Sequence, residues 1–246
     1  MLERLKRFGL QALRMDPVRQ RVAYARFVYF TRLRRRLSTV EEDGKGVVLN
    51  TIRHNLKGLT DLTVNRSHML VRPLSVIEAL GPESRVLAIG PRTEGELLNL
   101  FAHGFSPDRV RGLDLISYSP LIDLGNMHHL PYPDGSWDAV VLGWVLTYST
   151  EQQLAANEVL RVLRPGGVVA IGVEHNPRSD QEIRDQVDYD FGAFHRFKTT
   201  QEILDLFAGH VGQVYFRHDV IPERRDQVGA ICVIFSVTKS AAPSPA

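Results

Sequence analysis

The chain has 246 residues, a net charge of +2 and 43% hydrophobic residues, which suits one α/β domain with extensions rather than two full domains. Its single cysteine, Cys232, lies in an apolar run, which excludes a disulfide framework and a cysteine metal site. No apolar run approaches the roughly 20 residues that a membrane-spanning helix needs, and no secretory signal is present, so we expect a cytoplasmic protein.

Positive charge is concentrated at the N-terminus. Residues 1–36 hold eleven Lys and Arg against Glu3 and Asp16, a net charge of +9 that leaves −7 for the rest of the chain. We expect residues 1–46 to form a basic helical arm. In its helix one stripe is apolar, consisting of Val18, Val22, Ala25, Tyr29 and Leu33.

Three interpretations of this arm stay open. The helix packs on the domain with its arginines in solvent, or residues 1–40 contact an anionic membrane surface or a lipid-linked substrate, which would make the protein peripheral to the membrane. The third is nucleic acid, which we rank below the other two.

Residues 47–240 are predicted to form the main domain, and residues 241–246 a disordered tail. Strands are expected at 85–89, 110–116, 137–142 and 168–173, with helices at 94–101 and after residues 150 and 199. Residues 117–121 are too few for a crossover helix. The last two strands, 213–220 and 230–238, are joined closely enough to be antiparallel.

The most informative segment turns from the first strand through glycine into a helix, as Ile89-Gly90-Pro91-Arg92-Thr93-Glu94-Gly95, and Asp114 follows about 20 residues later. This pattern is typical of a nucleotide-like ligand with a ribose. Arg92 holds the middle glycine position, where a side chain obstructs a pyrophosphate, so NAD and FAD are disfavoured. A ligand with ribose and adenine but no phosphate fits better, and its amino-acid carboxylate can pair with Arg92. S-adenosylmethionine is such a ligand.

In these residues the chain resembles the class I S-adenosylmethionine-dependent methyltransferases with a type 11-like domain, over roughly residues 80–240. Further matching segments are 125–138, 143–148 and 163–167. The resemblance implies a Rossmann-like, doubly wound α/β sheet of about seven strands with the last strand antiparallel. It also implies a set of cofactor-binding residues: Ile89, Gly90, Pro91, Arg92, Glu94, Asp114, Leu115, Asn126, Met127, Gly143 and Trp144.

Several positions depart from the family pattern. Ala88 replaces a usual acidic residue, Arg92 and Glu94 replace usual glycines, and Asn126 stands where Asp is common. A noncatalytic binding or regulatory protein with the same fold is therefore the alternative to an enzyme.

Methyl transfer mainly requires alignment of donor and acceptor, with a base only when the acceptor must lose a proton. Residues just after the fourth and fifth strands are the candidates for this base, and we predict His175 first and Tyr148 second.

His128 and His129 are interpreted as polar residues of a loop rather than as metal ligands. Residues 188–195 are predicted to form a lid or substrate loop, or ordinary surface. The expected reaction is transfer to oxygen or nitrogen of a small-molecule, glycan- or lipid-linked acceptor.

Overall fold

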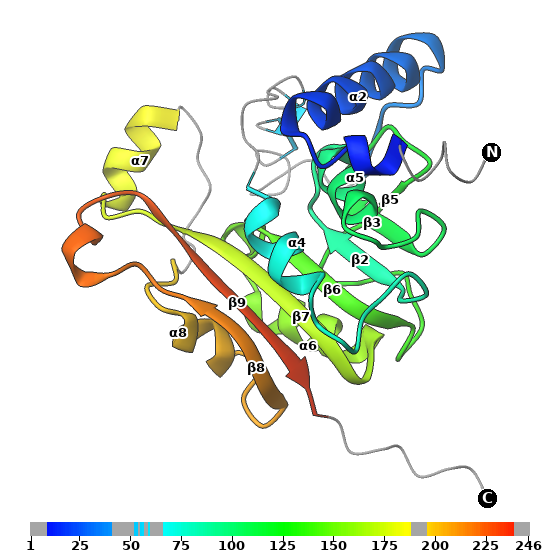
Figure 1. The fold of residues 1–246 in the computed structure, drawn as a ribbon. Helices are drawn as coiled ribbons and strands as arrows, with labels where there is room; N and C mark the ends of the chain where they lie inside the picture. Colours follow the sequence, from blue (N-terminus) through cyan, green and yellow to red (C-terminus); the bar gives the residue numbers. More distant parts are fainter. Residues whose placement is uncertain are drawn as a thin grey trace, which may run out of the picture.

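The computed structural model describes residues 9–40, 52–53, 55–56, 59, 66–187 and 196–238. Its centre is a seven-stranded sheet with the order β5-β3-β2-β6-β7-β9-β8 (Figure 1). β9 is antiparallel to both of its neighbours, whereas the other adjacent pairs are parallel. The predicted fold class is confirmed. The strands are β2 (Val86–Ile89), β3 (Val110–Asp114), β5 (Ile122–Leu124), β6 (Trp137–Gly143), β7 (Leu163–His175), β8 (Val211–His218) and β9 (Gly229–Val237).

Helices cover both faces of the sheet (Figure 1). Alternate residues of β2 enter different cores: Val86 and Ala88 pack with one cluster, and Leu87 and Ile89 with the other. A strand covered on both faces has no solvent side, which explains the continuous apolar runs. The helices are α4 (His68–Leu74) and α5 (Glu94–Ala102) on one face, α6 (Gln152–Val162) and α8 (Thr200–Asp205) on the other, and α7 (Asp180–Val187) beyond the end of β7.

The connection from β3 to β5 contains no helix, as predicted. It holds the short strand β4 (Ile116–Ser117), which pairs antiparallel with β1 (Ser38–Thr39). This pairing ties the chain that follows the N-terminal helix to the edge of the domain. Two further short elements are the 3₁₀ helices η2 (Leu146–Tyr148) and η3 (Pro222–Arg224).

The N-terminal helix α2 (Asp16–Val28) continues into the π-helical turn η1 (Tyr29–Leu33) and lies over α5 (Figure 1). Its packed face differs from the predicted apolar stripe. Arg19 and Ala23 are buried, whereas Tyr29 and Leu33 of that stripe are exposed. Burial is possible for Arg19 because its guanidinium donates to the carbonyl oxygen of Leu13 and pairs with Asp16.

No helix in the described part of the chain is long and apolar enough to cross a bilayer. The predicted lid loop at 188–195 and the predicted tail at 241–246 lie outside the described residues. The domain boundaries stay predictions.

Candidate cofactor and acceptor site

A cavity of about 450 Å³ opens where β2, β3 and β6 end. In doubly wound sheets ligands bind beyond the carboxyl ends of the parallel strands, so this is the expected position of a site. Most of the sequence-predicted cofactor residues line the cavity, namely Ile89, Gly90, Pro91, Arg92, Asp114, Leu115, Asn126, Met127, Gly143 and Trp144.

The glycine loop is held in shape by its own backbone and by Asp114. Gly90 has a φ of +70°, and a Cβ there would lie 2.6 Å from a methyl group of Val145, so only glycine fits. Arg92 adopts a left-handed φ of +49°, and its N–H donates to Oδ2 of Asp114 at 2.9 Å. Oδ1 of Asp114 accepts the N–H of Ile116 at 3.1 Å. Each carboxylate oxygen keeps a second acceptor position for a hydroxyl group.

The electrostatics of Asp114 follow from its position. Its side chain is 5% exposed, and burial raises its pKa, while the N–H groups of Arg92 and Ile116 oppose that rise. Burial of a carboxylate in a cavity is costly unless its oxygens are bonded. A ligand with paired hydroxyl groups would supply further donors to Asp114.

The segment after β5 supplies the far wall. Asn126 and Met127 line the cavity, and Oδ1 of Asn126 accepts the N–H of His128 at 3.1 Å. That bond closes a local turn and fixes the direction of the amide group. The oxygen can accept a second bond, which matches the amino group of an adenine.

The end of β6 brings Gly143 and Trp144 to the cavity. Trp144 has a left-handed φ of +58°, which is unusual for a bulky residue, and its N–H donates to the carbonyl oxygen of Gly172 at 2.7 Å. Its ring lies under the guanidinium of Arg66, 5.7 Å from the ring centroid. Strained backbone at a cavity wall is typical of a functional site.

Glu94 is the one predicted cofactor residue outside the cavity lining, so its role in binding stays a prediction. Its side chain is fully buried on the other side of the loop, where it pairs with the guanidinium of Arg26 on α2 and accepts from Ser119. Its N–H donates to the hydroxyl oxygen of Tyr118 at 2.9 Å. The first turn of α5 therefore anchors the N-terminal helix.

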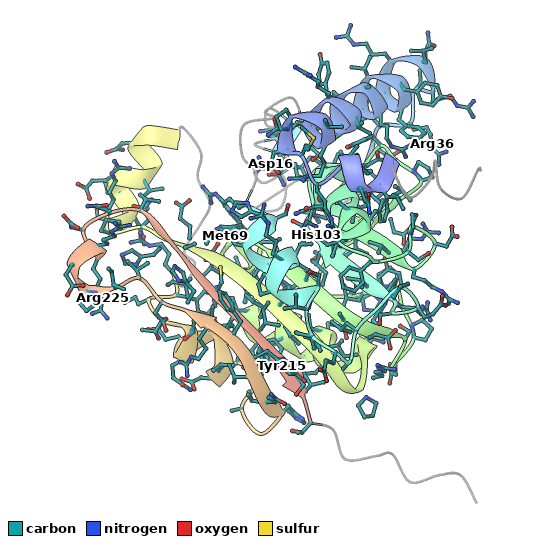
Figure 2. The ribbon with its side chains drawn as sticks, viewed as in Figure 1. Asp16, Arg36, Met69, His103, Tyr215 and Arg225 are labelled. Atoms are coloured by element: carbon teal, nitrogen blue, oxygen red, sulfur yellow. The ribbon has the colours of Figure 1, made fainter. Side chains whose placement is uncertain are left out.

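His175 also lies outside the cavity lining. Its Nε2 is 3.0 Å from the carbonyl oxygen of Arg225, in the connection between β8 and β9 and away from α2 (Figure 2). The neighbouring Glu174 lines the cavity instead. Successive side chains of a strand point to opposite sides, so β7 can direct only one of the two inward. The structure thus brings Glu174, and not His175, to the cavity lining, and the catalytic role of His175 stays a prediction.

Tyr148, the second candidate, does line the cavity. Burial raises the pKa of its hydroxyl, and the carboxylate of Glu174 adds to the effect. Tyr148 therefore stays protonated near neutral pH, a state in which its hydroxyl can donate a hydrogen bond. Glu174 itself is paired with Arg66 at 2.8 Å.

The sequence interpretation missed Glu96. This side chain lines the cavity from the first turn of α5, and burial, followed by the charge of Asp114, raises its pKa to about 8. In the sequence, Glu96 stands three residues after Thr93, and this spacing resembles a capping box. Nothing in that pattern says that the carboxylate turns inward.

Residues from the N-terminal third also line the cavity, which no motif indicated. They come from α2 and from the chain before α4, and they are Arg19, Gln20, Ala23, Asn55, Arg66 and Ser67. α2 thus serves as part of a roof over the cavity as well as a partner of α5.

Within the described ranges no cluster of His, Cys, Asp and Glu has the arrangement of a metal site. His128 is instead 2.6 Å from the hydroxyl of Ser149 through its Nε2, at the edge of the cavity.

Part of this chain is similar in sequence to known methyltransferases. Residues 94–171 match the model of a methyltransferase domain family. Two curated relatives are named demethylmenaquinone methyltransferase. The protein of Symbiobacterium thermophilum is 30% identical over 149 residues, which are 54% of this chain and 56% of that protein. That of Geobacillus stearothermophilus is 32% identical over 95 residues, 39% and 37% of the two chains. The chain spans about half the length, or less, of these relatives.

Solved structures show the same fold. The N-methyltransferase NodS of Bradyrhizobium japonicum, in complex with S-adenosyl-L-homocysteine, has a TM-score of 0.54 at 16% identity over 77% of this chain and 100% of that chain. An S-adenosylmethionine-dependent methyltransferase of Mesorhizobium loti has a TM-score of 0.52 at 16% identity over 70% and 98%. Residues 94–171 thus match a methyltransferase domain model, and the described residues share the overall fold of solved methyltransferase structures.

Proposed function

We propose that the protein transfers the methyl group of S-adenosylmethionine to oxygen or nitrogen of a small-molecule, glycan- or lipid-linked acceptor. The observation that carries this proposal is one open cavity that combines the glycine loop, the buried Asp114 and the amide of Asn126. Its volume of about 450 Å³ lies in the range of sites for ligands of this size.

Each part of the ligand has a matching group. The carboxylate of Asp114 would accept from the ribose hydroxyls, and Asn126 and Met127 would hold the adenine. Arg92 lines the cavity beside the glycine loop and would pair with the carboxylate of the amino-acid portion. The loop carries a side chain where a pyrophosphate needs glycine, which favours this ligand over NAD.

The substitutions that suggested a noncatalytic protein leave the cavity open. The side chain of Glu94 turns away to Arg26, and Ala88 is buried within β2. Of the side chains that depart from the family pattern, those of Arg92 and Asn126 are in the cavity lining. The cavity also has polar lining groups besides those proposed to hold the cofactor. Such groups can align an acceptor, which favours an enzyme over a binding protein.

When bound, S-adenosylmethionine supplies a methyl group on a sulfonium that an acceptor displaces directly. The chain's own residues align the acceptor and, where needed, take its proton. Glu174 is a carboxylate in the cavity lining and would act as that base, with its partner Arg66 and with Tyr148 nearby.

The acceptor side also has a charge preference. Arg66 reaches the cavity from the chain before α4, and Trp144 lies beneath its guanidinium. An acceptor with an anionic or aromatic part fits this pair. Because the two curated relatives are named for demethylmenaquinone, that compound belongs in any acceptor panel.

The test is transfer of a labelled methyl group from S-adenosylmethionine to a panel of phenols, amines, glycan-linked and lipid-linked compounds, including demethylmenaquinone. Glu174→Gln should lower turnover at least tenfold. The adjacent His175→Gln is the matched control and should stay within twofold of the native enzyme. Equal losses in both variants would remove the base role of Glu174, and no labelled product with any acceptor would favour the noncatalytic alternative.

A further inference from the structure

Glu96 has one carboxylate oxygen that the described residues leave without a hydrogen bond. Among the described residues, its Oε1 is buried and accepts no hydrogen bond. The other oxygen, Oε2, lies close to Gly143, where an added Cβ would be only 2.7 Å away. The N–H of Thr93, which a capping box would give to this carboxylate, is bonded to the carbonyl oxygen of Pro91. The side chain therefore has no capping role.

The other carboxylates that line the cavity are already engaged. Asp114 accepts two backbone N–H groups, and Glu174 is paired with Arg66. Buried polar groups in folded proteins normally have partners, so an unsatisfied carboxylate at a ligand cavity indicates a partner that arrives with the ligand. That partner must be a donor, and a cation suits it best.

The cavity fixes which part of the ligand meets Glu96. Asn126 and Met127 form the adenine wall and Asp114 the ribose wall, so the amino-acid portion lies beyond them, along the glycine loop and Gly143. Arg92 is the cation there and suits the carboxylate of this portion.

We propose, building on the proposed function, that Glu96 receives the α-ammonium group of the cofactor and becomes ionised only when that group binds. The geometry assigns the two charges of the amino-acid portion to opposite partners, the carboxylate to Arg92 and the ammonium to Glu96.

This assignment has a measurable consequence. The charged and titratable groups that share the cavity with Glu96 are Asp114, Arg19, Arg66, Arg92, His128, Tyr148 and Glu174. Burial, with the charge of Asp114, raises the pKa of Glu96 to about 8, so at pH 7 the empty site holds its proton. The bound ammonium lowers that pKa, and the proton passes to the buffer. About 0.9 proton is released per site at pH 7 and about 0.1 at pH 9, as follows from a pKa near 8.

The experiment is calorimetric titration of the full chain with S-adenosylhomocysteine in phosphate and in Tris, at pH 7 and pH 9. The binding enthalpy should depend on the ionisation enthalpy of the buffer with a slope near 0.9 proton released at pH 7, and the dependence should nearly vanish at pH 9. S-adenosylmethionine should give the same slope. 5′-Methylthioadenosine, which has no ammonium group, should give almost none.

Glu96→Gln keeps the shape and removes the proton. It should abolish the slope and lower the affinity for S-adenosylhomocysteine about tenfold, while 5′-methylthioadenosine binds within twofold of its native affinity. The inference is overturned if S-adenosylhomocysteine binds to the native protein without proton release, if the variant keeps the slope, or if only S-adenosylmethionine releases a proton. In each of those cases the proposed function stands. If neither sulfur ligand binds, the proposed function fails together with the inference.

Discussion

The lining of the cavity is built in two different ways. The part proposed to hold adenosine consists of short runs, 89–93, 114–115 and 125–127, each of which lies at or just after the end of a strand. Other lining residues come from positions far apart in the chain: Arg19 on α2, Arg66 before α4, Glu96 on α5 and Glu174 on β7. Local sequence therefore forms the part proposed for adenosine, whereas packing of distant segments forms the part proposed for the amino-acid portion and the acceptor.

The largest expected effect concerns the ion pair between Arg26 and Glu94, which joins α2 to α5. Arg26→Met leaves the buried carboxylate of Glu94 without its cation, and uncompensated buried charges are strongly destabilising. We expect the free energy of unfolding to fall by about 3 kcal/mol in urea denaturation. The exposed Arg21, changed to Met, is the matched control and should alter it by less than about 0.5 kcal/mol.

A second substitution sharpens this test. On the Arg26→Met background, Glu94→Gln removes the buried charge and should recover part of the lost stability. If Arg26→Met is neutral, or if Glu94→Gln makes the protein still less stable, the ion pair does not hold α2 on α5.

The next effect is the pH dependence of stability that Glu96 imposes. The folded-state pKa of Glu96, about 8, lies above the unfolded value. The contribution of Glu96 to the free energy of unfolding is therefore fully present below about pH 4.5 and is lost as pH rises toward 8. Relative to Glu96→Gln, the native protein should lose about 2–3 kcal/mol between pH 5 and pH 8.5, less than the full shift implies because the cavity admits water. Parallel pH profiles of the two proteins, measured by urea denaturation, would contradict the burial of this carboxylate.

The adenosine end is tested by Asp114→Ala. Loss of charge-assisted hydrogen bonds to the ribose should weaken S-adenosylhomocysteine binding by about 1.5–3 kcal/mol in calorimetry. Asp114→Asn, which keeps one acceptor oxygen for the N–H of Arg92 or Ile116, is the control and should lose less. Unchanged affinity in a folded Asp114→Ala protein would remove this residue from the site.

The smallest effect concerns the outer face of α2 and η1. Here Tyr24, Tyr29 and Leu33 are exposed, next to the exposed arginines 32 and 34–36. We predict salt-sensitive binding to anionic vesicles, with Arg34→Ser reducing the binding constant about fivefold, in line with about 1 kcal/mol per cation at a lipid surface. Sedimentation with vesicles at low salt measures it. If the native protein fails to pellet at low salt, the membrane interpretation is wrong.

Much of the fold was predictable because its signals are local. Apolar runs marked the central strands, and the short gap at 117–121 correctly indicated a missing helix. Thr199 caps α8 as its sequence suggests, by accepting the N–H of Glu202. The glycine loop and Asp114 were predictable for the same reason, since the chain places them at strand ends.

The differences from the sequence-based expectations come from the directions of single side chains. Glu94 stands in the glycine frame but turns to Arg26, because a cation on α2 and the hydroxyl of Ser119 compensate its burial. Glu174 and His175 are adjacent at the end of β7, and because side chains alternate along a strand only Glu174 faces the cavity. In α2 the buried face includes Arg19, because its charge is paired locally. The partners of Glu94 and Glu174, which are Arg26 and Arg66, lie far away in the sequence.

The most direct test of the cofactor assignment is calorimetric titration of the full chain with S-adenosylhomocysteine and, separately, with NAD at pH 8. The account predicts binding of the sulfur ligand at one site per chain and no heat with NAD, because the side chain of Arg92 occupies the place where a pyrophosphate needs glycine. Binding of NAD without binding of S-adenosylhomocysteine would contradict it.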